Sequence, residues 1–333
     1  MNFWQQLPRP FTVLAPLDGV TDVVFRQIIT KIGKPDVLFT EFTMTEGLLS
    51  KGREKVSQNL LFHPEEQPIV AQIWGTQPEH FYTVAKDLQT RGFAGIDINM
   101  GCPERTVIKN GACSALIHNP SLAAEIIQAT KEGAGYQMPV SVKTRIGFET
   151  ASVAEWIGFL LKQDLAALTV HLRTVAEMSK VPAHWEVMPQ IIALRDHLSP
   201  ETVLIGNGDL KSLDEVAKQY KAYGCEGFMI GRGVFANPWV FNPKVTLGDV
   251  TVMERVDLYL FHINLYYQTF GKERNFANLK KFAKTYLSNF PDATTLRERL
   301  METRTFVELK GRLEEYKAKA MEKQRQFVSE IMF

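Results

Sequence analysis

The stretch Ile96-Asp97-Ile98-Asn99-Met100-Gly101-Cys102-Pro103 decides how this chain folds. Its apolar run, interrupted by a single Asp, is typical of a buried strand that the Asn-x-Gly-Cys-Pro segment then ends. The glycine frees the backbone to turn, and the proline cannot donate a hydrogen bond to a sheet. The sequence therefore predicts a strand that presents a carboxamide and a thiol at its carboxyl end. A lone cysteine at such a turn is more often structural than catalytic, so the rest of the chain must decide its role.

Similar short apolar runs recur along the chain, with segments of helical periodicity between them. The expected strands are 12–15, 37–40, 69–73, 95–98, 140–144, 167–171, 203–205 and 227–230. The expected helices are 21–32, 78–90, 121–132, 152–163, 184–196 and 212–223. Alternation of strands and helices over about 240 residues predicts an α/β fold, a (β/α)8 TIM barrel. An open doubly wound sheet is the alternative, but it favours a G-x-G-x-x-G turn after the first strand, where this chain has Ala-Pro-Leu-Asp-Gly.

Composition narrows the class of protein. The chain has 333 residues, of which 45% are hydrophobic and 23% charged, as in ordinary globular proteins. A net charge of +1 indicates no overall attraction to a polyanion. Three scattered cysteines are too few for a disulfide framework or a zinc site. Since no signal peptide and no run of apolar residues long enough for a membrane span is evident, we expect a cytoplasmic protein.

A second domain is expected after a proline-containing break near residues 238–249. The predicted domains are a catalytic barrel over 1–243 and a smaller all-α helical domain over 244–333, with helices at 251–270, 273–290, 296–309 and 312–327. The helical domain carries 16 Lys and Arg against 12 Asp and Glu, a net charge of +4. Lys280, Lys281 and Lys284 lie on adjacent turns near aromatic residues. Such a cluster is either a phosphate-binding patch or an ordinary solvated face.

Polar residues recur at the ends of the expected strands. In a barrel these ends meet at one face, which is the catalytic face. Because a barrel has no free edge, Lys143 inside a strand needs a polar partner or a ligand. The glycine-rich turns around Gly208 and Gly231, with Arg232 beside them, favour a phosphate. A phosphate site together with Gln72 and Lys143 across the barrel mouth fits FMN, whereas a sugar-phosphate isomerase would need a carboxylate base that we cannot place.

Eight motifs in this order resemble those of the tRNA-dihydrouridine synthases, a family of FMN-dependent barrel enzymes. The motifs are 15–22, Gln72, 99–103, 111–116, 141–145, 170–174, 207–209 and 230–233. The Asn-x-Gly-Cys-Pro and His-x-Arg-Thr elements together make the resemblance specific. Leu17-Asp18 stands where the family often has Met-Ala or Met-Glu, which should leave a contact through the backbone intact. Two further residues depart from the family pattern, because Leu172 and Cys113 stand where glycine is common.

The resemblance implies a role for each matching residue. Cys102 is the expected proton donor, and the other expected residues fall into two groups. The cofactor contacts are Pro16, Leu17, Asp18, Gln72, Lys143, His171, Asn207, Gly208, Asp209, Gly231 and Arg232. The substrate contacts are Asn99, Arg145 and Arg173. We add the lysine cluster Lys280, Lys281 and Lys284 to them on its charge alone, because the helical domain matches the family only in being helical.

The implied reaction is reduction of the C5=C6 bond of a uridine in tRNA. NADPH is the expected reductant of FMN, which then passes hydride to C6, while Cys102 protonates C5 from the opposite face. The thiol must then be neutral, and the target base must leave its stack to reach the flavin. We expect tRNA as the partner, a monomer, and neither a metal nor a membrane.

Two other functions stay open at this point. One is a flavin-dependent barrel oxidoreductase that acts on a small dihydropyrimidine-like substrate, which would reoxidise the flavin without tRNA. The other is a non-catalytic tRNA-binding module with a vestigial flavin site, which would purify colourless. Intact Lys143, His171 and Cys102 argue against the second.

Overall fold

The computed structural model describes residues 2–331, which form two compact units. The first contains Lys34–Gly233 and the preceding chain up to Thr30, and the second contains Lys31–Gly33 and the chain from Val234 onward. The expected domain boundary after residue 243 falls inside the second unit. No helix among the described residues is long and apolar enough to cross a membrane.

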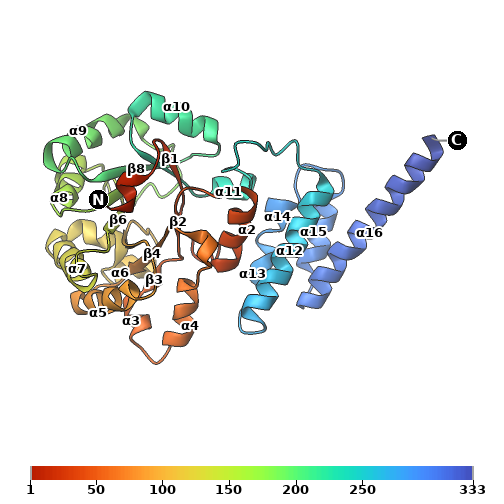
Figure 1. Ribbon diagram of the computed structural model, residues 1–333, viewed down its shortest axis with the longest axis horizontal. Helices are drawn as coiled ribbons and strands as arrows, with labels where there is room; N and C mark the ends of the chain where they lie inside the picture. Colours follow the sequence, from red (N-terminus) through yellow and green to blue (C-terminus); the bar gives the residue numbers. More distant parts are fainter. Residues whose placement is uncertain (1, 332–333) are drawn as a thin grey trace. The chain divides into compact units, whose positions relative to one another are not determined.

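The first unit is a nearly closed barrel of parallel strands (Figure 1), which confirms the predicted (β/α)8 fold. The strands, in their spatial order, are β1 (Phe11–Leu14), β9 (Gly227–Ile230), β8 (Val203–Asn207), β7 (Ala167–His171), β6 (Val140–Arg145), β5 (Gly95–Met100), β4 (Ile69–Trp74) and β2 (Leu38–Phe39). A bridge between Val13 and Val37 closes the ring, and the amide of Leu14 donates to the Val37 carbonyl at 3.1 Å. The short β3 (Thr43–Met44) pairs with the end of β4.

Helices surround the strands (Figure 1), and capping residues start several of them. They are α2 (Val23–Gly33), α3 (Thr45–Leu48), α4 (Arg53–Ser57), α5 (Pro78–Gln89), α6 (Arg105–Lys109), α7 (Pro120–Gly133), α8 (Gly158–Leu161), α9 (Met188–Leu198) and α10 (Leu213–Tyr223). The next helix, α11 (Gly233–Ala236), lies in the second unit from Val234 onward. The side chains of Asp22, Asn119 and Ser212 accept hydrogen bonds from the first turns of α2, α7 and α10. The expected helix 152–163 differs, since it begins as a π-helical turn, Val153–Ile157.

Apolar residues seal the amino-terminal end of the barrel. The short helix α1 (Phe3–Gln6) places Trp4 in the core, where its ring lies 6.0 Å from Phe11 and 6.3 Å from Phe39. Side chains from β1, β4, β7, β8 and β9 complete this core. Because the amino-terminal end of the barrel is filled with apolar side chains, a ligand can reach the barrel interior only from the carboxyl ends of the strands.

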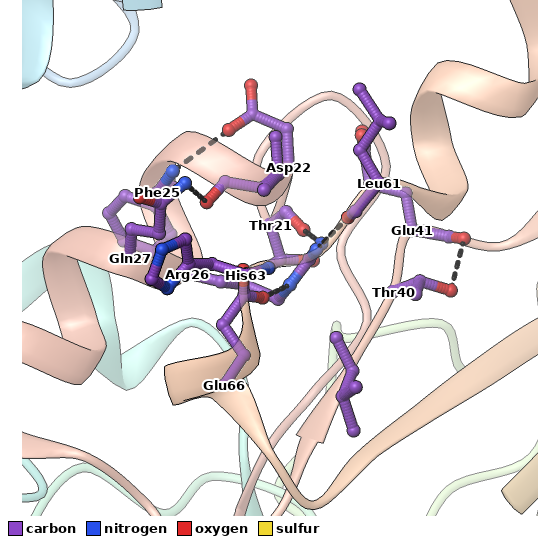
Figure 2. Close-up of polar contacts among 12 residues, drawn as sticks. Thr21, Asp22, Phe25, Arg26, Gln27, Thr40, Glu41, Leu61, His63 and Glu66 are labelled. Carbon is purple, nitrogen blue, oxygen red and sulfur yellow. Dashed lines mark hydrogen bonds and ion pairs between the residues drawn. The ribbon is translucent and has the colours of Figure 1, made fainter. Parts of the chain in front are cut away.

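A buried ion pair fastens the first loop of the barrel (Figure 2). Arg26 of α2 binds the carboxylate of Glu66, and both side chains are fully buried. The same guanidinium donates to the carbonyls of Thr21, at 2.6 Å, and Leu61. Burial raises the pKa of Glu66, while the charge of Arg26 opposes that rise. The pair therefore joins the loop that follows β1 to the segment that precedes β4.

The second unit is helical, as predicted, but two of its helices differ from expectation. Its helices are α12 (Val252–Phe270), α13 (Ala277–Lys280), α14 (Ala283–Tyr286), α15 (Ala293–Met301) and α16 (Phe306–Ile331). The expected helix 273–290 is broken into α13 and α14, because the Leu279 carbonyl accepts the Tyr259 hydroxyl at 2.9 Å and a tight 3₁₀-type bond from Phe282. The expected helix 296–309 ends at Met301, where Lys280 binds the carbonyls of Met301 and Thr303.

The buried pair predicts an asymmetric response to mutation. Arg26→Met should lower the free energy of unfolding by about 3–5 kcal/mol, because it leaves the Glu66 carboxylate buried without a cation. Arg26→Met combined with Glu66→Leu should recover most of that loss. Urea unfolding of each variant measures the effect. Arg53→Met, which removes the exposed partner of Asp87, is the control and should change stability little. An unchanged urea midpoint in Arg26→Met alone would contradict the assignment.

Candidate active site

The barrel mouth is built on a row of polar side chains across three neighbouring strands. Gln72 of β4, Asp97 of β5 and Ser141 of β6 are paired residues in the parallel register. Gln72 Nε2 donates to one oxygen of Asp97 at 2.8 Å, and Ser141 Oγ donates to the other at 2.6 Å. All three side chains are buried. Burial raises the pKa of Asp97 to about 6, against the opposing hydrogen bonds from Ser141 and Gln72.

Asn99 links this row to the turn that carries Cys102. Its Nδ2 donates to Gln72 Oε1 at 3.1 Å, and its Oδ1 accepts from the amides of Gly101 and Cys102, both at 3.0 Å. Ser114 Oγ donates to the Cys102 carbonyl at 2.7 Å. The predicted strand and turn are therefore present, and side chains hold the turn on both sides.

The Cys102 thiol is suited to remain protonated. It is partly buried and packs against the small cluster of Val107, Ala112 and Cys113. Burial raises the pKa of the Cys102 thiol, and the charge of Glu104 raises it further, although Lys143 and Arg145 oppose the rise. A neutral thiol is a proton donor and a poor nucleophile.

Lys143 is a buried cation to which the described part of the chain offers no hydrogen-bond acceptor. It lies beside Asn99 in the register of β5 and β6. Among the groups that the structure describes, none accepts a hydrogen bond from its Nζ. Burial lowers the pKa of Lys143 to about 8, and the charge of Arg145 contributes to the decrease, while Asp97 opposes it. A desolvated ammonium group of this kind has a strong preference for an anionic ligand.

Arg145, by contrast, donates three hydrogen bonds to carbonyl groups. Its Nε donates to Gly101 at 2.9 Å, and one terminal nitrogen donates to Thr174 at 2.9 Å and Met178 at 3.0 Å. Burial lowers its pKa to about 10. Arg145 thus ties the turn after β5 to the loop after β7, and the structure gives it a positioning role.

His171 and Arg173 follow β7 on the next part of the mouth. Burial, followed by the charges of Arg145 and Lys143, lowers the pKa of His171 well below its usual value, so the ring is neutral at pH 7. Its Nε2 faces an Arg173 nitrogen at 3.2 Å. Since a guanidinium can only donate, Nε2 is the acceptor and Nδ1 carries the ring proton.

Asp209, just after β8, forms ion pairs with two arginines, Arg173 and Arg232. It binds the guanidinium of Arg173, and its other oxygen accepts from Arg232 at 3.4 Å. Burial alone would raise the pKa of Asp209, but the hydrogen bond from Arg173 lowers it overall. Asn207 Nδ2 donates to the Met229 carbonyl at 2.8 Å, which joins β8 to β9. Arg232 remains exposed, beside Gly231.

The loop after β1 presents mainly its backbone. The amide of Leu17 donates to Thr21 Oγ1 at 2.8 Å, and the amide of Gly19 donates to Glu41 Oε1 at 2.7 Å. Pro16 is buried, whereas the Asp18 side chain is exposed. Figure 2 shows Thr21 close to Arg26, so the buried ion pair also fixes this loop.

The lysine cluster does not behave as one group. Lys281 and Lys284 are exposed, but Lys280 donates to the carbonyls that end α15 and lies over the ring of Phe276. Lys280 thus has a structural role within the second unit. Sequence reasoning could not detect this, because its partners are backbone groups more than twenty residues away.

Leu172 and Cys113, the two residues that stand where glycine is common in the family, are both buried in the core. Leu172 is fully buried, and its backbone bonds to Asn207 and His184 continue the loop. Cys113 is also fully buried and has a φ of 52°, in the left-handed region that glycine favours. Burial raises the pKa of the Cys113 thiol well above its usual value.

Sequence reasoning missed three groups that shape the site: Asp97, Ser141 and Glu41. Asp97 was visible as the single acid within an apolar strand, and Ser141 as its partner on the next strand. Nothing in the sequence indicated that Glu41 would accept from the amide of Gly19. No group of three or more His, Cys, Asp or Glu side chains in the described part of the chain could hold a metal ion.

Comparison with solved structures shows the fold alone. Histamine dehydrogenase from Rhizobium sp. 4-9 superposes with a TM-score of 0.52 at 14% identity, over 77% of this chain and 49% of that one. A 2-naphthoyl-CoA reductase superposes with a TM-score of 0.52 at 10% identity, over 69% of this chain and 49% of that one. The chain thus spans about half the length of each of these proteins.

Sequence comparisons are more specific. The family model for dihydrouridine synthase matches residues 13–323. A probable tRNA-dihydrouridine synthase 2 of Bacillus subtilis is 45% identical over 325 residues, which cover 96% of this chain and 98% of that protein. A probable tRNA-dihydrouridine synthase of Staphylococcus aureus is 44% identical, over 95% of this chain and 96% of that protein. With its barrel, its Asn-x-Gly-Cys-Pro turn and these relatives, the chain belongs to the dihydrouridine synthase family.

Proposed function

We propose that this protein is a tRNA-dihydrouridine synthase that uses FMN, reduced by NADPH, to reduce the C5=C6 bond of uridines in tRNA. The observation that carries the proposal is the pairing of the partly buried Cys102 thiol, whose pKa is raised, with Lys143 at the same barrel mouth, a cation for which the described residues provide no hydrogen-bond acceptor. Family membership supports an enzyme with a flavin cofactor. The expected cytoplasmic location and monomeric state stay predictions.

The residues at the mouth fit a flavin mononucleotide. Arg232 is exposed and can bind a phosphate, and Gly231 beside it has no side chain to cover its backbone. Lys143 needs an anionic or polar partner, and the residues that the structure describes do not supply one. Gln72 and His171, each held by protein groups, would contact the ring system, and Pro16 and Leu17 would supply backbone contacts.

FMN, when bound, would transfer hydride from NADPH to the uracil ring. The chain itself manages the proton. Cys102 holds it on Sγ at neutral pH, and Asn99 and Arg145 keep the turn that bears this thiol in place. Lys143, charged below pH about 8, would stabilise negative charge on the cofactor.

Exposed Lys281 and Lys284 would bind tRNA phosphates from the second unit. Arg173 and Asn99 would contact the substrate only through groups left free by their protein partners. Sequence relatives named as tRNA-dihydrouridine synthases favour this function over the small-molecule oxidoreductase and the non-catalytic module.

The proton-donor role predicts a selective loss in Cys102→Ala. This variant should bind FMN and oxidise NADPH as before, while tRNA-dependent flavin reoxidation slows about 10²–10⁴-fold, the usual contribution of a general acid. Stopped-flow absorbance of the flavin, with mass spectrometry of the tRNA, measures both steps. Cys225→Ala removes a thiol that is fully buried elsewhere and is the matched control. A normal rate of flavin reoxidation by tRNA in Cys102→Ala would exclude the proton-donor role. In the wild-type protein, flavin reoxidation by free uridine as fast as that by tRNA would favour a small-molecule substrate.

The lowered pKa of Lys143 predicts how FMN binding depends on pH. Lys143 is charged below its pKa of about 8 and neutral above it. Because an anionic ligand favours the charged form, FMN affinity should fall by up to about tenfold per pH unit above that point. Fluorescence titration of the flavin-free protein measures this dependence. Lys143→Arg should flatten it, since arginine stays charged, and exposed Lys162→Gln should not. If FMN affinity fell with pH in Lys143→Arg as it does in the wild-type protein, the pH dependence would belong to another group.

The lysines of the second unit predict a salt-dependent effect on tRNA. Lys281→Glu combined with Lys284→Glu should weaken tRNA binding and reduce the salt slope of the binding constant by about 2, if each lysine contacts one phosphate. Flavin absorbance should stay unchanged. The control, Lys86→Glu with Lys162→Glu, makes the same change in net charge at exposed positions of the barrel. Equal weakening in both double variants would show that only net charge matters.

A further inference from the structure

A continuous chain of hydrogen bonds runs from a buried carboxylate to the turn that bears the candidate acid. It begins at Asp97, passes through the side-chain amides of Gln72 and Asn99, and ends at the backbone amides of Gly101 and Cys102. Each donor–acceptor distance along it lies between 2.8 and 3.1 Å. Asp97 itself lies one layer below the mouth and is fully buried.

The chemistry at its two ends fixes the direction of this chain. Backbone amides can only donate, so Asn99 must face them with Oδ1 and offer Nδ2 to Gln72. Gln72 then accepts through Oε1 and must find an acceptor for Nε2. An ionised carboxylate is an acceptor only, and Asp97 is the group that meets Nε2. If the Gln72 amide were reversed, its oxygen would face that carboxylate.

We propose that Asp97 is a positioning residue of this site, whose carboxylate fixes the orientation of the Gln72 and Asn99 amides and so holds the turn that carries Cys102. The inference rests on the proposed function only in treating the Cys102 thiol as the acid. Nothing that we propose for cofactor or tRNA binding uses Asp97.

Other contacts make this role specific to one side of the turn. Arg145 binds the carbonyl of Gly101, and Ser114 binds the carbonyl of Cys102. The two amides are held by Asn99 alone among the described groups. Loss of the Asp97 acceptor should therefore loosen the amide side and leave the carbonyl side bound.

Two variants of Asp97 separate positioning from mere filling of space. Asp97→Leu keeps the branched shape but removes the acceptor for Gln72. Asp97→Asn keeps an acceptor oxygen for Gln72, and its amide nitrogen can donate to Ser141, whose hydroxyl already lies 3.5 Å from the Ile96 carbonyl. Asp97→Asn should therefore preserve the series of hydrogen bonds from residue 97 to the turn, whereas Asp97→Leu should break it.

Hydrogen exchange of the flavin-free, full-length protein tests the difference without any activity measurement. Exchange at the Gly101 and Cys102 amides should be about five- to tenfold faster in Asp97→Leu, as expected for one lost hydrogen bond, and near wild type in Asp97→Asn. Alkylation of Cys102 by iodoacetamide should follow the same order, because Cys113 and Cys225 are fully buried. Wild-type exchange and alkylation in folded Asp97→Leu would overturn the proposal.

Ser141→Ala decides the matter if Asp97→Leu does not fold. It removes only the hydroxyl on the second carboxylate oxygen, so it should produce a smaller acceleration at the same two amides. Thr130→Val removes a buried hydroxyl bond to Ile126 in α7 and is the matched control, with no change expected at the turn. No acceleration in Ser141→Ala, or an equal one in Thr130→Val, would overturn the proposal.

The result stands apart from the proposed function. If the protein failed to reduce tRNA, the exchange and alkylation measurements would still show whether Asp97 holds the turn. If the measurements showed Asp97 to be a passive core residue, the proposed reaction would still stand. Its test is the activity with tRNA and the dependence of that activity on Cys102.

Discussion

Unshifted parallel pairing across β4, β5 and β6 is the constraint on which the site depends. It aligns Gln72, Asp97 and Ser141 in one row, and the alternation of side chains along β5 places Asn99 on the same side two residues later. A slip of one residue would turn this set of side chains away from the barrel interior. Hydrogen bonds among these side chains therefore favour this register in addition to apolar burial, and the residues that shape the site also help to define the sheet.

The barrel mouth holds more positive than negative side chains, and they are partly shielded from water. The free-energy cost of this desolvation is compensated by hydrogen bonds for some of these cations but not for all. Arg145 is satisfied by three carbonyls, and Arg173 by Asp209 and the Val181 carbonyl. Lys143 is not offset by any hydrogen bond from the described part of the chain. Since an unpaired buried charge is unfavourable, an anion that binds beside Lys143 should stabilise the folded protein.

Much of this architecture was predictable from sequence, because the barrel depends on repeated local patterns. The strand that begins at Gly95 and the helix that begins at Pro78 were both located by periodicity and turn residues. The break at Leu279 was not predictable, since it depends on a hydroxyl from Tyr259 in another helix. The same holds for Lys280. Cys102 and Lys143 were predicted from their chemical signature in the sequence, and the structure places both at the barrel mouth. Glu41 was not predicted, because it acts through a long-range contact that leaves no local pattern.

The raised pKa of Cys102 has a consequence for the durability of the protein. Peroxide and disulfides react with the thiolate form of cysteine, and burial keeps little of this thiol in that form at neutral pH. Cys113, packed against it, is fully buried and even less ionised. Two neighbouring sulfur atoms beside a redox cofactor would otherwise invite oxidation to sulfenic acid or a disulfide. The burial that keeps the Cys102 thiol protonated, as its proposed role requires, thus also protects it from oxidation.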